Sequence, residues 1–562
     1  MSINLHPALF LILGGLILPL FRGKVRQALL IIFPLLGFIN LLGHESGNFW
    51  SLYFGGYDLE VLRVDKLSLI FGYLFHLAAL LAAIYSLHLK DGLQHMTGFM
   101  YAGSAVGAVF AGDLLTLFIF WELLAITSVF QIWARRSSRS GASGLRYLLV
   151  HVTSGLFLLT GAAIQYQNTG SLSFKHMELA SWSSYFIFIA FGIKCAFPFL
   201  HTWLVDSYPE ATPTGTVFLS SFTTKTAVYA LARGFEGTEQ LIWIGALMTM
   251  FPIFYAVIEN DLRRVLGYSM INQIGFMVAG IGLGAGMGVN GAVAHAFNDV
   301  IFKGLLFMSM GAVLFRTGRI NGSDLGGLYK SMPFTTGFCL VGASSISAFP
   351  LFSGFVSKSM VMQSAADQGH LVIWLMLLFA SAGVFHHAGI KIPFFAFFSK
   401  DSGIRCKEAP INMLFAMWVG AFLCIFIGCY PRPLYSMLPY PVDYLPYTAT
   451  HVLLQLQVLF FSALAFTYLK LSGTYPPELK SVNIDIDWIY RRLLPSFASR
   501  VLRVGTPLKT KIINTCRSQI DLGVALIYRH YGPEGIFERT WLTGSIVLMV
   551  TIALAAYLIY YF

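Results

Sequence analysis

Long apolar stretches separated by short polar segments run along most of the chain. Most have about 17 to 25 residues, the length that an α-helix needs to cross a bilayer, and the longer ones fit tilted or broken helices. The pattern predicts an all-α polytopic membrane protein with about 14 to 16 transmembrane helices. The predicted spans are 6–22, 27–43, 66–86, 94–111, 113–133, 143–165, 183–200, 211–233, 239–259, 264–284, 288–314, 333–364, 370–397, 410–430, 450–471 and 540–561.

Lys and Arg residues are concentrated in alternate loops. Because cytoplasmic loops carry the excess of positive charge, the asymmetry of about fourfold predicts that the N-terminus lies outside. Loops after odd-numbered spans contain Arg22, Lys24, Arg26, Lys90, Arg135, Arg136, Arg139, Arg146, Arg263, Arg264, Arg316, Arg319, Lys330, Lys400, Arg405 and Lys407. Loops after even-numbered spans contain little beyond Arg63, Lys175, Arg233 and Arg432.

Composition agrees with a membrane protein and narrows its chemistry. Hydrophobic residues make up 56% and charged residues 11% of the chain, whereas soluble domains have about 25% charged residues. The net charge of +11 lies in short loops, so a basic face for nucleic acid is not predicted. We expect no disulfide framework, metal site, iron–sulfur cluster or nucleotide cofactor, because the cysteines lack ligand spacing and glycine fingerprints are missing. The cysteines are Cys195, Cys339, Cys406, Cys424, Cys429 and Cys516.

Ionisable side chains inside the apolar spans are the strongest functional signal. They are Glu122, Lys194, Lys225, Lys303 and Lys358. A charge at the middle of a membrane helix costs about 2.5–3.5 kcal/mol on insertion scales and usually marks an ion or proton path. The alternative for each lysine is that its long stem lifts the ammonium to the interface. Glu122 has a short stem near the middle of its span, so this alternative is weak for it.

Two of these spans are broken by proline beside the lysine. Pro198 follows Lys194, and Pro350 precedes Lys358. Irregular backbone at membrane depth is tolerated where it lines a cavity, and transporters place such breaks at corresponding positions of two repeats. We therefore predict two inverted five-helix repeats, 94–233 and 239–397, after N-terminal helices in 1–93. The alternative is that both prolines kink helices for packing alone.

The C-terminal part is predicted to contain further membrane helices in 398–471, an interfacial segment in 472–539 and a final span in 540–562. The interfacial segment alternates apolar and basic residues, as helices lying in a membrane surface do. A solvated linker helix is the alternative. Pro495, Gly505 and Pro507 interrupt the segment, so we predict that it is not one continuous helix.

A dozen ordered motifs over residues 66–397 resemble the antiporter-type subunits shared by respiratory complex I and the Mrp-type cation/proton antiporters. They are Phe120-Trp121-Glu122-Leu123-Leu124, Lys194 with Pro198, His201 and Trp203, Ala211-Thr212-Pro213-Thr214, Lys225, Asn260 to Ser269, His295-Ala296-Phe297, Lys303 to Phe307, Gly326-Gly327-Leu328, Met332-Pro333, and Ser353-Gly354-Phe355 with Lys358. Toward the C-terminus, Gly389 to Phe398, Asp401 to Arg405 and Glu408-Ala409-Pro410 look most like the D-type subunit of bacterial Mrp antiporters. The interfacial stretch and the last span instead resemble the L-type subunit of complex I, which has a long lateral helix before its final span.

The resemblance implies a proton relay. In that family a glutamate of the fifth span pairs with a lysine of the seventh, and further groups carry the proton across the membrane plane. The matching residues are Glu122, Lys194, Lys225, His295, Lys303 and Lys358. Asp299 stands where several relatives have a second histidine, and at four residues before Lys303 it shares a helix face with that lysine. Lys391 is a further candidate carrier, with snorkelling as its alternative.

Three functions remain open on this evidence. The first is the proton-translocating subunit of a multi-subunit Na⁺ or K⁺/proton antiporter in the inner membrane of a bacterium. The second is a proton-pumping subunit of a complex I-type NADH:quinone oxidoreductase or membrane hydrogenase. The third is a proton-coupled partner of another solute uptake complex. In each, the expected partners are other membrane subunits, protons, monovalent cations and the lipid bilayer, and the chain itself is a transporter subunit, not an enzyme.

Overall fold

The computed structural model describes residues 1–562 except 1–4, 285, 481–482, 532–542 and 562. It divides into two compact units, Met1–Asn483 and Ile484–Phe562. Residues 532–539 of the predicted interfacial segment and 540–542 of the predicted last span lie outside the described residues.

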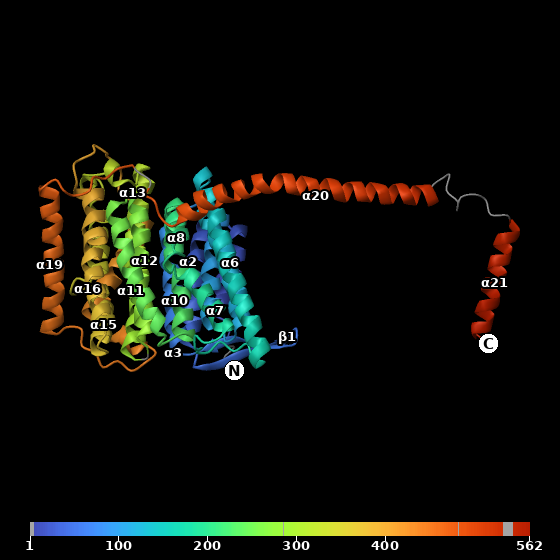
Figure 1. The fold of residues 1–562 in the computed structure, drawn as a ribbon. Coiled ribbons are helices and arrows are strands. Elements are labelled where there is room, and N and C mark those ends of the chain that lie inside the picture. Colours follow the sequence, from blue (N-terminus) through green and yellow to red (C-terminus); the bar gives the residue numbers. More distant parts are fainter. Residues whose placement is uncertain (1–4, 285, 481–482, 532–542, 562) are drawn as a thin grey trace. The chain divides into compact units, whose positions relative to one another are not determined.

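The first unit is a bundle of helices with one small sheet (Figure 1). Its N-terminal part has α1 (Ala8–Ile17), η1 (Leu18–Leu20), α2 (Gly23–Leu42), β1 (Gly47–Phe54), β2 (Tyr57–Val64) and α3 (Lys66–Ser86). The first predicted repeat has α4 (Gly92–Phe110), α5 (Leu114–Trp133), α6 (Ser138–Thr169), α7 (Trp182–Lys194), α8 (Thr202–Ser207), η2 (Tyr208–Glu210), α9 (Pro213–Ser221) and α10 (Thr223–Gly234).

The second predicted repeat and the helices that follow complete this unit. The repeat has α11 (Glu239–Ile258), α12 (Leu262–Gly282), α13 (Met287–Thr317), η3 (Gly322–Asp324), η4 (Leu328–Lys330), α14 (Pro333–Ile346), α15 (Ser353–Asp367), α16 (Leu371–Val384) and the π-helical segments η5 (Phe385–Lys391) and η6 (Phe394–Phe398). The helices α17 (Ile411–Cys429), α18 (Arg432–Ser436) and α19 (Ala449–Leu471) follow, and α19 stands at the edge of the bundle beside α16 (Figure 1).

The predicted all-α polytopic membrane fold is confirmed. Among the described residues, 11 helices are long and apolar enough to cross a membrane, and three shorter apolar helices accompany them. Two of the shorter ones, Trp182–Lys194 and Pro333–Ile346, are the first halves of the helices that the prolines were predicted to break.

The two broken helices have the same local structure. Each contains an Ala-Phe-Pro sequence, and positive φ angles occur at Ala196 (60°) and Phe199 (70°) in one and at Ala348 (57°) and Leu351 (75°) in the other. Non-glycine residues rarely adopt this region, and such residues gather at functional sites. The break after α7 and the break after α14 are therefore built in the same way.

Backbone hydrogen bonds repeat in the same positions. The amide of Phe197 donates to Gly192 O at 3.0 Å, and the amide of Phe349 donates to Ser344 O at 3.0 Å. These bonds satisfy carbonyl groups that the end of each helix would otherwise leave unpaired.

The helices that precede the two breaks also correspond to one another, α5 to α12 and α6 to α13. Asp113 caps α5, and Asp261 caps α12. The long helices α6 (32 residues) and α13 (31 residues) both end at a glycine with a φ of 67–68°. Arg135, just after α5, and Arg263, at the start of α12, both donate to Pro209 O, so α5 ends where α12 begins. The matched helices therefore start at opposite ends of the bundle.

A β-hairpin fills the connection between α2 and α3, for which the sequence pattern predicted no regular structure. Strands β1 and β2 pair antiparallel around Gly55 and Gly56, whose φ angles are 61° and 88°. Two residues with positive φ make the turn whose twist suits a hairpin, and Gly-Gly is one of its typical sequences. That dipeptide between two stretches rich in aromatic and β-branched residues could have predicted it.

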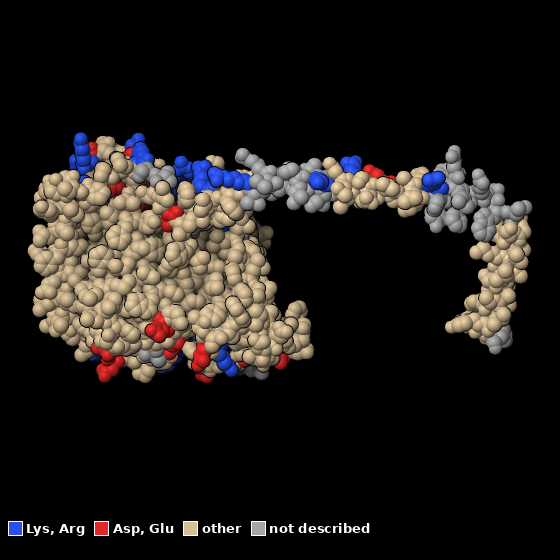
Figure 2. Space-filling view, in the orientation of Figure 1, with Lys and Arg blue, Asp and Glu red and all other residues tan. Residues whose placement is uncertain are grey.

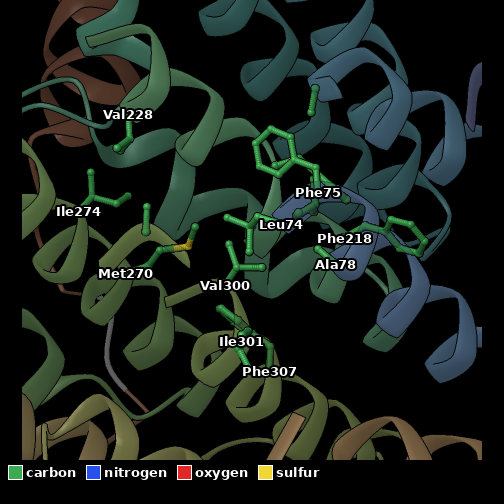
Figure 3. Close-up of a cluster of buried hydrophobic side chains, with 14 of the residues drawn as sticks. Leu74, Phe75, Ala78, Phe218, Val228, Met270, Ile274, Val300, Ile301 and Phe307 are labelled. Carbon is green, nitrogen blue, oxygen red and sulfur yellow. The ribbon is translucent and has the colours of Figure 1, made fainter. Parts of the chain in front are cut away.

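The apolar core continues from one predicted repeat into the other. Figure 3 shows Leu74 of α3 near Met270 of α12 and Val300 of α13, and Phe218 of α9 beside Phe75 and Ala78 of α3. Close packing of this kind excludes water between polar groups except where side chains leave room for it. Polar residues buried in this region therefore need partners within the protein.

Asp65 joins α3 to the hairpin and to α10. Its carboxylate accepts a hydrogen bond from the Ser68 amide at 2.8 Å and lies 2.7 Å from the Arg233 guanidinium. Burial opposes ionisation, but Arg233 and the Ser68 hydrogen bond hold the pKa of Asp65 below its ordinary value. A lowered pKa means that ionised Asp65 stabilises the fold above about pH 4, and that this contribution is lost as the pH falls through the folded-state value.

We expect Asp65→Asn to lower the stability of the solubilised protein at neutral pH by up to about 1 kcal/mol, because asparagine keeps the helix cap but not the ion pair. The difference from the parent should shrink on acidification below about pH 4. Thermal unfolding followed over a pH series measures it, with Asp58→Asn on the exposed hairpin turn as the control. A difference that stays constant with pH would contradict the role of the charge.

The second unit contains η7 (Ile489–Leu493), α20 (Leu494–Tyr531) and α21 (Thr543–Tyr561). The prediction that prolines interrupt this segment is wrong, because α20 is one helix of 38 residues. Pro495 directly follows the π-helical segment η7, and the chain stays helical from residue 487 through this proline. Pro507 removes one hydrogen bond from a long helix, which is too little to end it. The helix α21 is apolar and long enough to cross a membrane.

Candidate functional site

Lys194 is the last residue of α7, directly before the break, and it is fully buried. Its Nζ donates to the carbonyl oxygen of Trp121 on α5 at 2.6 Å and lies 4.4 Å from the centre of the Trp121 ring. An ammonium over an indole ring is attracted by the negative face of the ring. The lysine is thus held inside the bundle and does not extend to the membrane surface.

Glu122 lies beside Lys194, but the two form no direct ion pair in the part of the chain that the structure describes. Their charges interact, and the Glu122 carboxylate packs so closely on Gly155 of α6 that a Cβ there would overlap Oε1. Glu122 Oε1 has no hydrogen-bond partner among the described residues. A carboxylate without a fixed partner can approach or leave the lysine at little cost in broken hydrogen bonds.

His151 on α6 is a neighbour that the sequence-based predictions missed. Its ring is fully buried against Tyr147 and Trp203, with ring centres 4.1 Å and 4.4 Å away, and the charge of Lys194 acts on it. Neither ring nitrogen has a partner within the described residues. The criterion that found the lysines, an ionisable residue within an apolar span, would also have found this histidine.

Lys225 and Asp299 form a fully buried ion pair with 2.6 Å between Nζ and Oδ2. The expectation that Asp299 meets Lys303 is wrong, because Lys225 from α10 takes the contact and Lys303 Nζ donates to Ser269 Oγ at 2.8 Å. Spacing along one helix shows which residues share a face, whereas a neighbouring helix decides which of them are paired. Asp299 still acts electrostatically on Lys303 and Lys358.

The helix predicted over 211–233 is also interrupted, between α9 and α10 at Phe222. Lys225 Nζ donates to the carbonyl oxygen of Ser220 at 3.1 Å, just before the interruption. The run Ser220-Ser221-Phe222-Thr223-Thr224 consists of weak helix formers. A third irregular segment therefore lies next to a buried lysine.

His295 connects α12, α13 and α15. Its Nδ1 lies 3.0 Å from Ser357 Oγ and its Nε2 lies 3.1 Å from Gln273 Oε1. Because Gln273 Oε1 only accepts, Nε2 carries the hydrogen in this arrangement. The charges of Lys225, Lys303 and Lys358 all act on the ring. The structure thus brings together five of the predicted relay residues: Lys225, His295, Asp299, Lys303 and Lys358.

Lys358 lies in the second turn of α15, after the second break. Its Nζ donates to Ile346 O at 3.1 Å, and it borders a cavity of about 50 Å³ that is also lined by Gln363, His451 and Gln455. Much of its lining is apolar, but a space of this size that is bordered by several polar side chains can hold water. The relay lysine is thereby connected to polar side chains of α19.

The first break lies near the cluster around Lys225, because Cys195, the residue after Lys194, is within electrostatic range of Lys225. Glu122, Lys194, Lys225, His295, Asp299, Lys303 and Lys358 thus follow one another from α5 to α15.

Lys391 lies apart from this series. It is fully buried at the end of η5, so its ammonium does not extend to the membrane surface. Among the described residues no group of three His, Cys, Asp or Glu side chains could hold a metal ion.

Comparison with known proteins places this arrangement in a family. Residues 111–385 match the family described as "NADH:quinone oxidoreductase/Mrp antiporter, TM". The A-type subunit of the Na⁺/H⁺ antiporter from Bacillus subtilis is 29% identical over 60% of this chain and 48% of its own length. Hydrogenase-4 component B of Escherichia coli is 25% identical over 65% of this chain and 62% of its own length. The matched part spans about half the length of the antiporter relative.

Solved structures share the fold at 22% sequence identity. A chain of the Mrp complex from Dietzia sp. superposes with a TM-score of 0.78 over 92% of this chain and 62% of its own length. A chain of the archaeal membrane-bound sulfane sulfur reductase has a TM-score of 0.73 over 99% of this chain and 100% of its own length. The family match, the relatives and the shared fold agree, and the chain belongs to the antiporter-type membrane subunits of the NADH:quinone oxidoreductase/Mrp antiporter family.

Proposed function

We propose that the chain is the proton-translocating subunit of a multi-subunit Na⁺ or K⁺/proton antiporter. The observation that carries the proposal is the series of buried ionisable side chains between α5 and α15. A buried lysine changes its proton affinity readily when a carboxylate approaches or leaves. Glu122, which has no fixed partner, would tune Lys194, and Asp299 would tune Lys225, Lys303 and Lys358.

The matched local structures support two repeats of inverted orientation, 94–233 and 239–397, with one broken helix each. We place the end of the bundle that carries Arg135 and Arg263 in the cytoplasm and the N-terminus outside, because positive charge marks the cytoplasmic side. Figure 2 supports this orientation, since Lys and Arg side chains of the first unit gather at the upper end of its helices. The remaining partners would be other membrane subunits and lipid in a bacterial inner membrane.

A redox-driven complex is the second candidate. The archaeal sulfane sulfur reductase chain matches this chain over nearly the full length of both, and that fold likeness extends further than the match to the Mrp chain. In such a complex the same relay would be driven by electron transfer in other subunits.

The test is proton movement in inverted membrane vesicles from an antiporter-deficient host that expresses the complete complex. We expect addition of Na⁺ or K⁺ to dissipate an imposed pH gradient. Proton movement that needs an electron donor and is unaffected by either cation would instead support the redox-driven complex.

A further inference from the structure

A second group of buried ionisable side chains lies outside the relay. Lys391 Nζ is 3.0 Å from Glu478 Oε1, and the two side chains are 0% and 7% exposed. The same nitrogen donates to the carbonyl oxygens of Val257 at 2.6 Å and Glu259 at 2.7 Å, at the end of α11. The ammonium is therefore enclosed by oxygen atoms from two parts of the chain that are far apart in sequence.

The segment that carries Lys391 is wound as a π-helix. Such turns are rare and often occur at functional sites, since they widen the helix and turn side chains away from their usual direction. The segment packs on the second broken helix, because a Cβ at Gly389 would overlap Ser347 Oγ. Lys358 binds the carbonyl of Ile346, one residue before Ser347, so the relay and η5 meet at this break.

His387 lies on η5 between the two groups of ionisable residues. It is fully buried, and the charges of both Lys303 and Lys391 act on its ring. Neither ring nitrogen has a well-oriented hydrogen-bond partner within the described residues, although the Gly383 carbonyl lies one turn earlier. Buried polar groups are nearly always paired, and an unpaired imidazole in a transport protein needs an explanation.

Glu478 comes from the segment after α19, which is anchored at the same end of the bundle. Tyr475 packs against Phe466 and His386, with ring centres 5.2 Å and 5.7 Å apart. Lys480 pairs with Asp324 at 2.9 Å, and Asn483 donates to Glu259 Oε2 at 3.1 Å. The segment thus brings a carboxylate to Lys391 from the outer side of the bundle.

We propose that His387, Lys391 and Glu478 form a second proton branch, which joins Lys303 to the end of the bundle that carries Arg264, Lys330 and Lys400. A proton would pass between Lys303 and His387, then to Lys391, and Glu478 would exchange it with the surface. Each transfer leaves one group protonated and its neighbour neutral, so no other reactant is needed. The proposal rests on the proposed relay and adds a route by which the relay exchanges protons with that end.

The groups that surround Lys391 favour transfer over a fixed ion pair. His386 and His387 lie on its own segment, Glu259 lies between α11 and α12, and Glu478 approaches from beyond α19. The side chains of His386, His387 and Glu478 are ionisable, whereas the carbonyl oxygens of Val257 and Glu259 hold the amine in place. A purely structural pair would need only the charge of residue 391.

Lys391→Arg separates these two roles, because arginine keeps the charge and the pair with Glu478 but does not release its proton. We expect cation-dependent proton flux to fall at least about tenfold in vesicles that contain normal amounts of complex. Lys330→Arg, which changes a lysine paired with Asp401 at the surface, is the matched control and should retain parental flux. Parental flux in Lys391→Arg would overturn the proposal.

His387→Gln is the second variant, since it retains a polar side chain of similar size and cannot carry a proton. We expect the same loss of flux, and unchanged flux would overturn the branch even if Lys391→Arg failed to assemble. Lys194→Ala measured alongside distinguishes the two hypotheses. If Lys194→Ala is inactive while the His387 and Lys391 variants are fully active, the relay stands and the branch fails. If Lys194→Ala is active, the relay itself fails.

Discussion

Lys194→Ala is expected to abolish cation-dependent proton flux while the complex still assembles. Lys194 is fully buried beside the first break, with its ammonium on the Trp121 carbonyl and ring. Alanine cannot take up a proton there, so the series from Glu122 to Lys225 would lose a member. Quenching of a pH-sensitive dye in inverted vesicles measures the flux, with the amount of complex determined on the same vesicles.

Lys90→Ala, which removes an exposed lysine, is the matched control and should transport normally. Lys194→Arg adds a second comparison, because it keeps a charge that remains protonated. We expect it to assemble and to be inactive. Parental flux in assembled Lys194→Ala complex would show that protons take another path.

Asp299→Asn is expected to destabilise the protein by about 3–5 kcal/mol, because it leaves the Lys225 ammonium buried without its counter-charge. Both side chains are 0% exposed, so water cannot take the place of the carboxylate. Lys225→Gln should have a cost of the same order. The double variant removes both charges, and we expect it to recover most of the stability and none of the transport. Thermal unfolding of the solubilised complex and flux in vesicles measure the two properties.

The surface pair of Lys330 and Asp401, 2.9 Å apart, provides the control cycle. Exposed pairs contribute about 0–1 kcal/mol, so the same three variants there should show little coupling. Strictly additive losses at Lys225 and Asp299 would mean that the two charges do not depend on each other. Full transport by the double variant would remove both residues from the relay.

The sequence predicted the parts of this structure that depend on local chemistry. Pro198 and Pro350 predicted the two breaks, and the structure confirms them. The positive φ angles of Ala196 and Ala348 could not be read from the sequence, since alanine itself prefers other conformations and tertiary packing imposes these. The hairpin was missed although Gly55 and Gly56 give a recognisable signal.

The partner of a buried charged side chain often comes from a helix that is distant in sequence, so the sequence did not predict these pairs. Asp299 shares a helix face with Lys303, yet Lys225 of α10 takes its carboxylate, and helix spacing contains no information on that third helix. The Lys391–Glu478 pair could not be predicted for the same reason, since its members lie 87 positions apart in the sequence. Pro495 was counted as an interruption, although the chain stays helical from η7 through this proline into α20.

Three of the relay lysines are held by main-chain carbonyls: Lys194 by Trp121 O, Lys225 by Ser220 O and Lys358 by Ile346 O. Each acceptor is a main-chain oxygen, which every residue type has. Alanine scanning therefore does not remove it, and substitutions at these three positions leave it in place. Replacing the following peptide bond by an ester would weaken the carbonyl as an acceptor without changing any side chain. The fold itself therefore supplies the acceptors that hold these lysines. Directed evolution of ion coupling can change the lysines' surroundings only through the carboxylates and histidines around them.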